Sequence, residues 1–382
     1  MRPSMISAAL VAALVGYGST IALVLAAAQA VGASPAQTAS WIAAICFAKA
    51  IGSMLLSTWK KVPIVLAWST TGAALIAAST GINMNEAVGA FILAGGLLAL
   101  TAAVPPINRA VSSIPTGIAS GMLAGVLLPF CLAVASYAVS DWPIVLPLIA
   151  VFLIVRLLSP LYAVLAALAT GLVIAFTYAG VPVPGFDFEP LSLVFIKPDF
   201  NPAVLIGLGV PLYLVTMASQ NLPGFAVLRA HGYTPPVAAS LGVTGIGSMV
   251  ASLFGAHTIN MAAITAAICL GDDVHPDKSR RWQVGIAYGV FWILLGLFGP
   301  VIIVTIIAMP KAIIAVVAGL ALITPLIGAL ASAFDAPATR FAAAATFIVT
   351  ASGIAAFGIG AAFWGLLAGL LVHLMDGLRR RK

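Results

Sequence analysis

Charged side chains are scarce in this sequence. Asp, Glu, Lys and Arg together make up 7% of the 382 residues, against roughly 25% in an average soluble domain. Hydrophobic residues make up 62%, and a soluble core of this size could not bury them all. The scarcity of charge therefore excludes an ordinary soluble protein and indicates a chain whose solvent is lipid.

Cysteine is rare, and the common catalytic motifs are absent. The three cysteines, Cys46, Cys131 and Cys269, stand alone inside apolar segments, which excludes a disulfide framework and a cysteine metal site. The sequence contains no His-Glu-x-x-His, no Gly-x-Ser-x-Gly and no Walker-type glycine loop. We therefore predict neither an enzyme nor a nucleotide-driven pump, with no cofactor and no metal.

What the sequence does contain is a succession of apolar segments of roughly 15 to 28 residues, about the length that crosses a hydrocarbon layer. The first run resembles a secretory signal, but it is too long for one, so we interpret it as a membrane segment. We predict an all-α integral membrane protein with fourteen segments, at 5–31, 36–57, 62–79, 86–104, 115–138, 143–157, 160–180, 202–228, 235–254, 256–270, 283–308, 311–331, 339–357 and 359–378.

The net charge of +7 lies in the loops and at the C-terminus, which is typical of a topogenic signal and not of a nucleic-acid surface. Placing the N-terminus in the cytoplasm puts fourteen of the 17 basic residues there. They are Arg2, Lys60, Lys61, Arg109, Arg156, Arg229, Lys278, Arg280, Arg281, Arg340, Arg379, Arg380, Arg381 and Lys382. We predict a multi-pass protein of the bacterial inner membrane with both termini in the cytoplasm.

Lys197 and Lys311 fall outside in this topology, and Lys49 falls within the second segment. A lysine at that depth costs roughly 2.5–3.5 kcal/mol on insertion scales. Lys49 therefore either snorkels to the membrane surface, pairs with another group or touches the substrate.

The two halves of the chain repeat one another. Gly-Ala-Ser-Pro at 32–35 matches Gly-Tyr-Thr-Pro at 232–235, Ile-Gly-Ser-Met at 51–54 matches the same four residues at 246–249, and Pro115 matches Pro310. We predict two seven-segment repeats, 1–180 and 202–382. Because seven is odd, the second repeat is inverted in the membrane, which is typical of alternating-access transporters with a site near the bilayer midplane.

Segments 3 and 10, the third of each repeat, do not look like plain helices. Segment 10 has 15 residues, which as helix would reach roughly 22 Å of the roughly 30 Å needed. Residues 256–260 and 63–68 look extended, and Ser-Thr-Thr-Gly at 69–72 looks like the start of a helix. We predict two short strands that meet antiparallel, each followed by a half-helix, with two tilted or re-entrant helices as the alternative.

Two such half-helices would aim their N–H groups and positive dipole ends at one point, which suits an anion such as a carboxylate. The segments placed at the midplane contain no Asp or Glu, which also favours an anion over a cation.

Polar residues inside segment 10 are the first candidates for the site. His257 is titratable at membrane depth and could carry a coupled proton, the alternative being a neutral histidine bonded to a backbone carbonyl. Thr258 and Asn260 follow it along the strand, where neighbouring side chains alternate, so not all three can face one ligand.

Segments 8 and 1 add further candidates. Segment 8 carries Thr216, Ser219, Gln220 and Asn221 before a Pro-Gly pair, and such a cluster is typical of a cavity, although bonds to neighbouring helices are the alternative. Segment 1 carries Gly-Tyr-Gly-Ser-Thr at 16–20, where tight packing is an equal alternative to ligand contact.

Three of these stretches carry a resemblance to a known family. Pro-Ile-Val-Leu-Ala-Trp-Ser-Thr-Thr-Gly at 63–72, Thr-Met-Ala-Ser-Gln-Asn-Leu-Pro-Gly at 216–224 and Gly-Ala-His-Thr-Ile-Asn-Met-Ala-Ala-Ile-Thr at 255–265 resemble the benzoate/proton symporter (BenE-type) family. The resemblance continues into His-Pro-Asp at 275–277 and covers essentially the whole chain.

The resemblance implies the uracil-transporter fold of the nucleobase–ascorbate and anion-exchanger relatives. In that fold a core of segments 1–4 and 8–11, here about 5–104 and 202–308, moves against a gate of segments 5–7 and 12–14, here about 115–180 and 311–378. His257 aligns where nucleobase carriers have a glutamate, and a histidine suits a carboxylate better than it suits the N–H edge of a base. Thr71 departs from the family's usual Ser-x-Pro-Gly run, so the entry to this half-helix is expected to differ locally.

The resulting hypothesis is proton-coupled import of benzoate or a similar aromatic carboxylate, with the carboxylate held by the half-helix N-termini at 69–72 and 258–261 and His257 as the proton-coupling residue. The expected substrate contacts are Trp68, Ser69, Thr70, Thr71, Gly72, Tyr17, Ser19, Ser219, Gln220, Asn221, His257, Thr258, Asn260 and Met261. A nucleobase or inorganic-anion carrier of the same fold, an intramembrane enzyme and a pore are alternatives. The oligomeric state stays open, with a homodimer as one alternative.

Overall fold

The protein is described here by a computed structural model, which covers residues 2–18, 20–104, 115–160, 162–181, 192–272, 274–299, 308–357 and 359–380. The first half is helical apart from one short strand. Its elements are α1 (Pro3–Gly18), α2 (Ile21–Ala30), α3 (Pro35–Lys60), β1 (Leu66–Trp68), α4 (Thr70–Ala77), α5 (Met84–Ala103), α7 (Thr116–Ser140), α8 (Trp142–Leu158) and α9 (Ala163–Thr177).

The second half begins with one long helix that is interrupted twice by π-helical turns. This helix consists of α10 (Pro202–Val204), η1 (Leu205–Gly209), α11 (Val210–Thr216), η2 (Met217–Asn221) and α12 (Leu222–Ala230). The elements that follow it are α13 (Val237–Ser252), β2 (Ile259–Met261), α14 (Ile264–Leu270), η3 (Lys278–Arg280), α15 (Gln283–Leu297), α17 (Lys311–Phe334), η4 (Pro337–Thr339), α18 (Arg340–Ala351) and α19 (Ala361–Arg380).

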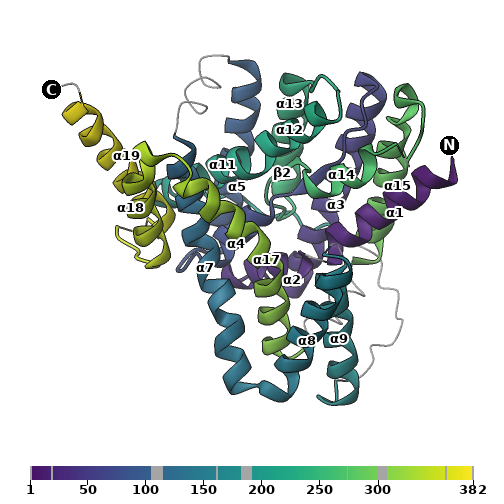
Figure 1. The fold of residues 1–382 in the computed structure, drawn as a ribbon, viewed down its shortest axis with the longest axis horizontal. Helices are drawn as coiled ribbons and strands as arrows, with labels where there is room; N and C mark the ends of the chain where they lie inside the picture. The colour runs from purple at the N-terminus through teal and green to yellow at the C-terminus, as the bar shows by residue number, and fades with distance from the viewer. Residues whose placement is uncertain are drawn as a thin grey trace.

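Helices from the two halves pack against one another around the strands. α15 lies along α3, and α13 lies along α5, while α7 packs against α17 and α18. Figure 1 shows β2 near the centre of the molecule, α7, α8 and α9 extending to one side, and the two termini at opposite ends of the long axis. The strands, and the site built on them, are therefore enclosed by helices from both ends of the sequence.

The matched Gly-x-x-Pro motifs form the same helix ending in each half. Gly32 and Gly232 have φ angles of +69° and +73°, in the left-handed region that glycine adopts at little cost. Each closes a Schellman motif: Gly32 N–H bonds to Gln29 O and Ala33 N–H to Ala28 O, as Gly232 N–H bonds to Arg229 O and Tyr233 N–H to Leu228 O. The sequence match at these two sites is therefore a match of backbone structure.

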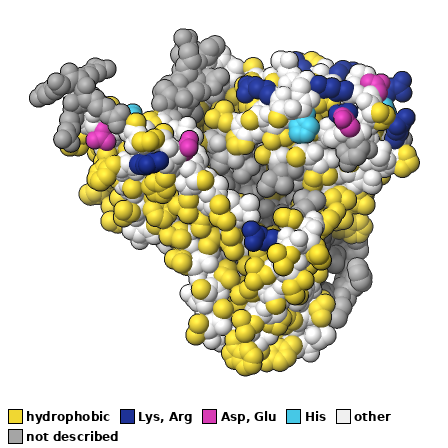
Figure 2. Space-filling model, in the orientation of Figure 1, with side chains coloured by type: hydrophobic (Ala, Val, Ile, Leu, Met, Phe, Trp, Pro, Cys, Tyr) yellow, Lys and Arg dark blue, Asp and Glu magenta, His cyan; other side chains and the backbone are white. Residues whose placement is uncertain are grey.

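The helices have the length and polarity of membrane spans. Six helical stretches of the described residues are long and apolar enough to cross a membrane: Pro3–Ala30, Pro35–Lys60, Met84–Ala103, Thr116–Ser140, Pro202–Ala230 and Lys311–Phe334. Four shorter apolar helices accompany them. Figure 2 shows most charged side chains of this face along its upper edge and hydrophobic side chains over the part around α7, α8 and α9. The protein is thus a mostly helical membrane protein, while the count of fourteen segments stays a prediction.

Segments 8 and 13 differ from regular helices with the predicted ends. The long helix of segment 8 widens into η1 and η2, and each π turn ends two residues before a proline, Pro211 or Pro223. Proline has no N–H to donate, so the regular bonding pattern must change there. The thirteenth segment ends at Ala351 and not at 357.

Candidate functional site

The predicted pair of antiparallel strands is confirmed. Leu66 lies opposite Met261, Ala67 opposite Asn260 and Trp68 opposite Ile259. Two further backbone bonds continue the pairing, from Ser69 N–H to Thr258 O at 2.9 Å and from Ala262 N–H to Val65 O at 3.1 Å. Extended backbone is tolerated at membrane depth only where its polar groups have partners. Here the facing N–H and C=O groups of the two strands bond to each other.

The outer edges of this small sheet are completed by side-chain hydroxyls. Ser53 Oγ accepts the N–H of Leu66 at 2.9 Å, and Ser248 Oγ accepts the N–H of Ile259 at 3.0 Å. Both serines come from the repeated Ile-Gly-Ser-Met motif. Tyr288 adds a third contact, donating its hydroxyl to Leu66 O at 2.9 Å. The repeated motif therefore holds the two strands from opposite sides.

The start of α4 is joined to segment 8 and to β2 by hydroxyl groups. Ser69 caps the helix by accepting the N–H of Gly72 at 3.1 Å, as its position in the sequence predicts. Thr216 Oγ1 lies 3.0 Å from Ser69 Oγ and 2.9 Å from Thr258 Oγ1. Thr71 Oγ1 lies 2.7 Å from Ser219 Oγ. These bonds bring three predicted site segments to one place.

Two asparagines serve the strand backbone directly. Asn221 Oδ1, at the end of the η2 turn, accepts the N–H of Met261 at 2.9 Å. The Asn260 side chain, oriented to satisfy both of its ends, donates to Met261 O at 3.0 Å and accepts from Ser69 N–H at 3.2 Å. Both side chains are fully buried, so they fix the crossing of the strands.

His257 is a fully buried link between two helices. Its Nδ1 lies 3.0 Å from Trp41 Nε1, and its Nε2 lies 3.1 Å from Ser69 O. An indole N–H can only donate, so Nδ1 is the acceptor and the proton is on Nε2. Both ring nitrogens are occupied in this neutral tautomer, which is the backbone-bonded alternative considered for this residue. Adding a proton would place an N–H on Nδ1 against that of Trp41.

Lys49 lies in an aromatic enclosure beside β1. Its Nζ is 3.6 Å from the centroid of the Trp68 ring and 2.8 Å from that of Trp292. The rings of Tyr17, Trp68 and Trp292 lie 5.2–5.9 Å from one another. Trp68 is anchored by a hydrogen bond from its Nε1 to Thr20 Oγ1. Lys49 therefore does not snorkel; it is 1% exposed and lies against aromatic faces.

The structure brings most of the predicted contacts together but not all in the predicted way. The buried ones are Tyr17, Trp68, Ser69, Thr71, Gly72, Asn221, His257, Thr258, Asn260 and Met261, and those of intermediate exposure are Thr70, Ser219 and Gln220. Ser19 lies outside the described residues.

One feature of the prediction is wrong: 258–261 is not the start of a half-helix. β2 occupies Ile259–Met261, and α14 begins at Ile264. The strand bonds use this backbone, which therefore has few N–H groups left to offer a ligand. Likewise the first strand is confined to Leu66–Trp68 within the predicted 63–68.

Five residues at the site were missed from the sequence: Trp41, Trp292, Tyr288, Ser53 and Ser248. Single aromatic residues in apolar helices look like ordinary packing, and nothing in the local sequence marks their partners. Ser53 had a signal, since its motif recurs at Ser248.

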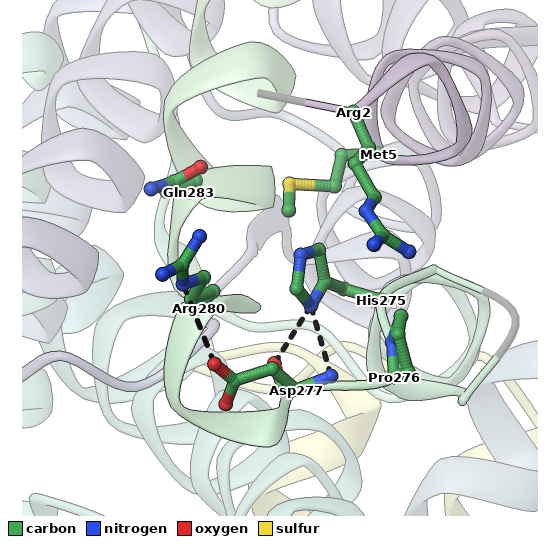
Figure 3. Close-up of a pocket in the computed structure, with 7 residues that line it drawn as sticks. All are labelled: Arg2, Met5, His275, Pro276, Asp277, Arg280 and Gln283. Carbon is green, nitrogen blue, oxygen red and sulfur yellow. Dashed lines mark hydrogen bonds and ion pairs between the residues drawn. The ribbon is translucent and has the colours of Figure 1, made fainter.

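The loop after α14 forms a polar hollow at one end of the molecule. Figure 3 shows Arg2, His275, Asp277 and Arg280 around it, with Arg280 paired to Asp277 and the His275 ring against the Asp277 backbone. Hydrogen bonds from the side chain and then the backbone of Ser279 lower the pKa of the Asp277 carboxyl. The hollow measures about 430 Å³, and its lining is open to water.

Arg281, beside this hollow, ties the loop to the end of α14. It donates to Leu270 O at 2.9 Å and to His275 O at 2.6 Å, and it pairs with Asp272. A cation at a helix C-terminus satisfies free carbonyls and complements the helix dipole. Arg281 thus anchors the far end of the half-helix that follows β2. Within the described residues, no three potential metal ligands lie together.

Broken spans joined by a strand pair inside a bundle of apolar helices define a membrane transporter. The fold is shared with SLC26A9 (TM-score 0.61, 12% identity, 98% of this chain and 66% of that chain) and with the transmembrane domain of the cyanobacterium bicarbonate transporter BicA (TM-score 0.57, 13% identity, 99% and 98%). At such identities the likeness is one of fold alone.

The chain belongs to the benzoate membrane transport protein family, whose model matches residues 1–375. It is 39% identical to the inner membrane protein YdcO of Escherichia coli (strain K12), over 98% of this chain and 96% of that one. It is 34% identical to the benzoate membrane transport protein of Acinetobacter baylyi (strain ATCC 33305 / BD413 / ADP1), over 96% and 94%. The predicted family is confirmed, whereas the link to nucleobase–ascorbate transporters stays a prediction.

Proposed function

We propose that this protein imports benzoate or a similar aromatic carboxylate across the bacterial inner membrane by proton symport. The observation that carries the proposal is the strand crossing, where buried hydroxyl and amide groups surround the start of α4 and no Asp or Glu of the described residues contributes. Such a site offers donors to an anion and no counter-charge to a cation. A relative 34% identical is named a benzoate membrane transport protein, and one 39% identical is named an inner membrane protein.

The proposed mechanism is alternating access by two inverted seven-segment repeats. Matched contacts in the two halves support it: Gly52 packs closely on the Leu66 side chain as Gly247 packs on that of Ile259, and the two motif serines bond the same two strands. A core of about 5–104 and 202–308 would move against a gate of about 115–180 and 311–378. Both termini would lie in the cytoplasm, following the distribution of basic residues.

The substrate would lie between the start of α4 and the η2 turn. The contacts proposed for it are the predicted set, of which Gln220 and Thr70 make no side-chain hydrogen bond to the described part of the chain. Thr70 and Thr71 lie in the first turn of α4, where N–H groups have no partner within the helix.

His257 remains the proposed proton-coupling residue, with one condition. A proton can enter Nδ1 only if the bond from Trp41 breaks, because two N–H groups cannot face each other. Protonation is therefore tied to a rearrangement in which Trp41, on α3, separates from the residue that leads into β2. This link between proton and conformation is what symport needs.

The experiment is uptake of labelled benzoate into proteoliposomes. We expect accumulation with an inward proton gradient, its loss on adding a protonophore, and competition by other aromatic carboxylates but not by uracil or bicarbonate. Uptake that ignores the gradient would reject the coupling, and the absence of uptake would reject the substrate. Competition by bicarbonate or by uracil would instead favour one of the alternative carriers of the same fold.

A further inference from the structure

Lys49 is a buried titratable amine with no anionic partner in the described part of the chain. It sits in the middle of α3 and is 1% exposed. The ion pairs of the described residues join Arg280 to Asp277 and Arg281 to Asp272, at the polar end of the molecule. A charge held in a low-dielectric interior without a counter-charge is costly. A lysine at this position therefore suggests a functional role for its amine.

Aromatic faces supply part of its stabilisation. The Trp68 and Trp292 rings lie against Nζ at 3.6 and 2.8 Å, within the range of cation–π attraction. Tyr17 closes the group from α1, with its ring 5.7 Å from Trp68 and 5.9 Å from Trp292. Residues from four elements, α1, α3, β1 and α15, thus lie together, and we call Tyr17, Lys49, Trp68 and Trp292 the aromatic box.

The box contains two more buried polar atoms that lack a well-formed hydrogen bond. Tyr17 Oη has no partner among the described residues, and Trp292 Nε1 has only the Tyr288 side chain near it. Buried polar groups are nearly always paired, and each unpaired one costs about 1–3 kcal/mol. Indole N–H and ammonium groups only donate, and a phenol can donate. Two poorly satisfied donors beside the Lys49 amine favour a ligand that accepts several hydrogen bonds and carries negative charge.

The box adjoins the strand crossing. Trp68 forms one of its walls, ends β1 opposite Ile259 and immediately precedes Ser69, the cap of α4. Only the Trp68 side chain would therefore separate a small aromatic acid at the crossing from Lys49. Its carboxylate matches the donors, and its ring matches the faces of Trp68, Trp292 and Tyr17, which favour stacked or edge-on aromatic partners.

Resting on the proposed function, we infer that Lys49 is the group that binds the substrate carboxylate, and that the aromatic box selects an acid whose carboxylate is attached to a flat ring. On binding, carboxylate oxygens take the place of ring faces as partners of Nζ and accept from Tyr17 and Trp292. The bound pair is neutral in sum, which removes the cost of the unpaired lysine. An uncharged aromatic amide of the same shape would bring no negative charge, so it would not offset the cost of burying the lysine.

The test compares benzoate with benzamide, its uncharged analogue, by calorimetric titration of the purified protein in nanodiscs. We expect wild type to prefer benzoate. Lys49→Met should weaken benzoate binding by about 30-fold or more, the size expected when one partner of a buried charge pair is removed, and should leave benzamide binding unchanged. Lys60→Met is the matched control, because Lys60 ends the same helix over the face of Trp59 at a partly exposed position.

Two further variants keep the inference testable if Lys49→Met does not fold. Tyr17→Phe and Trp292→Phe each remove one poorly satisfied donor and keep an aromatic ring, and each should weaken benzoate more than benzamide. The role of the box is overturned if Lys49→Met binds benzoate as wild type does, or if both of these variants do. In either case, benzoate uptake by wild type would leave the proposed function standing. Wild type that binds no aromatic acid would overturn both.

Discussion

Ser53 and Ser248 hold the same position relative to the two crossing strands. Each serine donates its hydroxyl to the carbonyl four residues earlier in its helix. Each Oγ also accepts a strand N–H, that of Leu66 in one half and that of Ile259 in the other. Both lie in Ile-Gly-Ser-Met, 195 positions apart in the sequence. The repeated motif therefore binds one strand in each half of the chain.

Replacing either serine should destabilise the crossing. Ser53→Ala or Ser248→Ala leaves a buried strand N–H without an acceptor, at a cost of about 1–3 kcal/mol each, so the melting temperature in detergent should fall in both. Thr58→Val is the control, because the Thr58 hydroxyl bonds only to carbonyls of its own helix. An equal fall of the melting temperature in the control would show that the hydrogen bonds to the strands contribute no more to stability than a hydroxyl bonded within its own helix.

The Trp41–His257 bond should set the proton dependence of uptake. Trp41→Phe keeps the ring and removes the N–H that opposes a proton on Nδ1, so half-maximal proton-driven uptake should move to higher pH. His257→Gln should abolish the dependence on the gradient. Both are measured as benzoate uptake against external pH, and a profile identical to wild type in both variants would assign the proton to another group.

Thr71 offers a way to separate a backbone donor from a hydroxyl. Thr71→Val removes the hydroxyl that contacts Ser219 and keeps the backbone N–H, whereas Thr71→Pro removes both, at a position in the first helical turn where proline needs no helical bond. If this N–H also donates to the carboxylate that Lys49 is proposed to bind, Thr71→Pro should raise the KM for benzoate about tenfold beyond Thr71→Val, the size of a hydrogen bond to a charged group. Equal KM values would exclude that N–H from the site.

Arg281 and Arg280 should behave differently despite being neighbours. Arg281 is 5% exposed and bonds the C-terminal carbonyl of α14, so Arg281→Met should lower stability by about 1–3 kcal/mol. Arg280 pairs with Asp277 in water, and such pairs contribute about 0–1 kcal/mol. Melting temperatures of the two variants at low and high salt would check this, and an equal loss would contradict the anchoring role of Arg281.

The broken spans could be predicted because length and residue type are local properties. Segment 10 is too short to cross as a helix, and Ser69 has the chemistry of a helix cap, so both the strand pair and the start of α4 follow from the sequence. The start of the second half-helix could not be placed, because the strand extends to Met261 only through bonds to β1 from the other half of the chain.

The sequence by itself determined that this chain lies in lipid, that short motifs recur in its two halves and that its family is one of benzoate transport proteins. The length of apolar segments and the identity and spacing of motifs are local properties of the chain, so they can be recognised without knowing the tertiary contacts. Tertiary structure alone decided that His257 bonds to Trp41 and that Lys49 lies between Trp68 and Trp292. Those residues come from helices and strands far apart in sequence, and the state of a buried charge or imidazole depends on which groups the fold places against it.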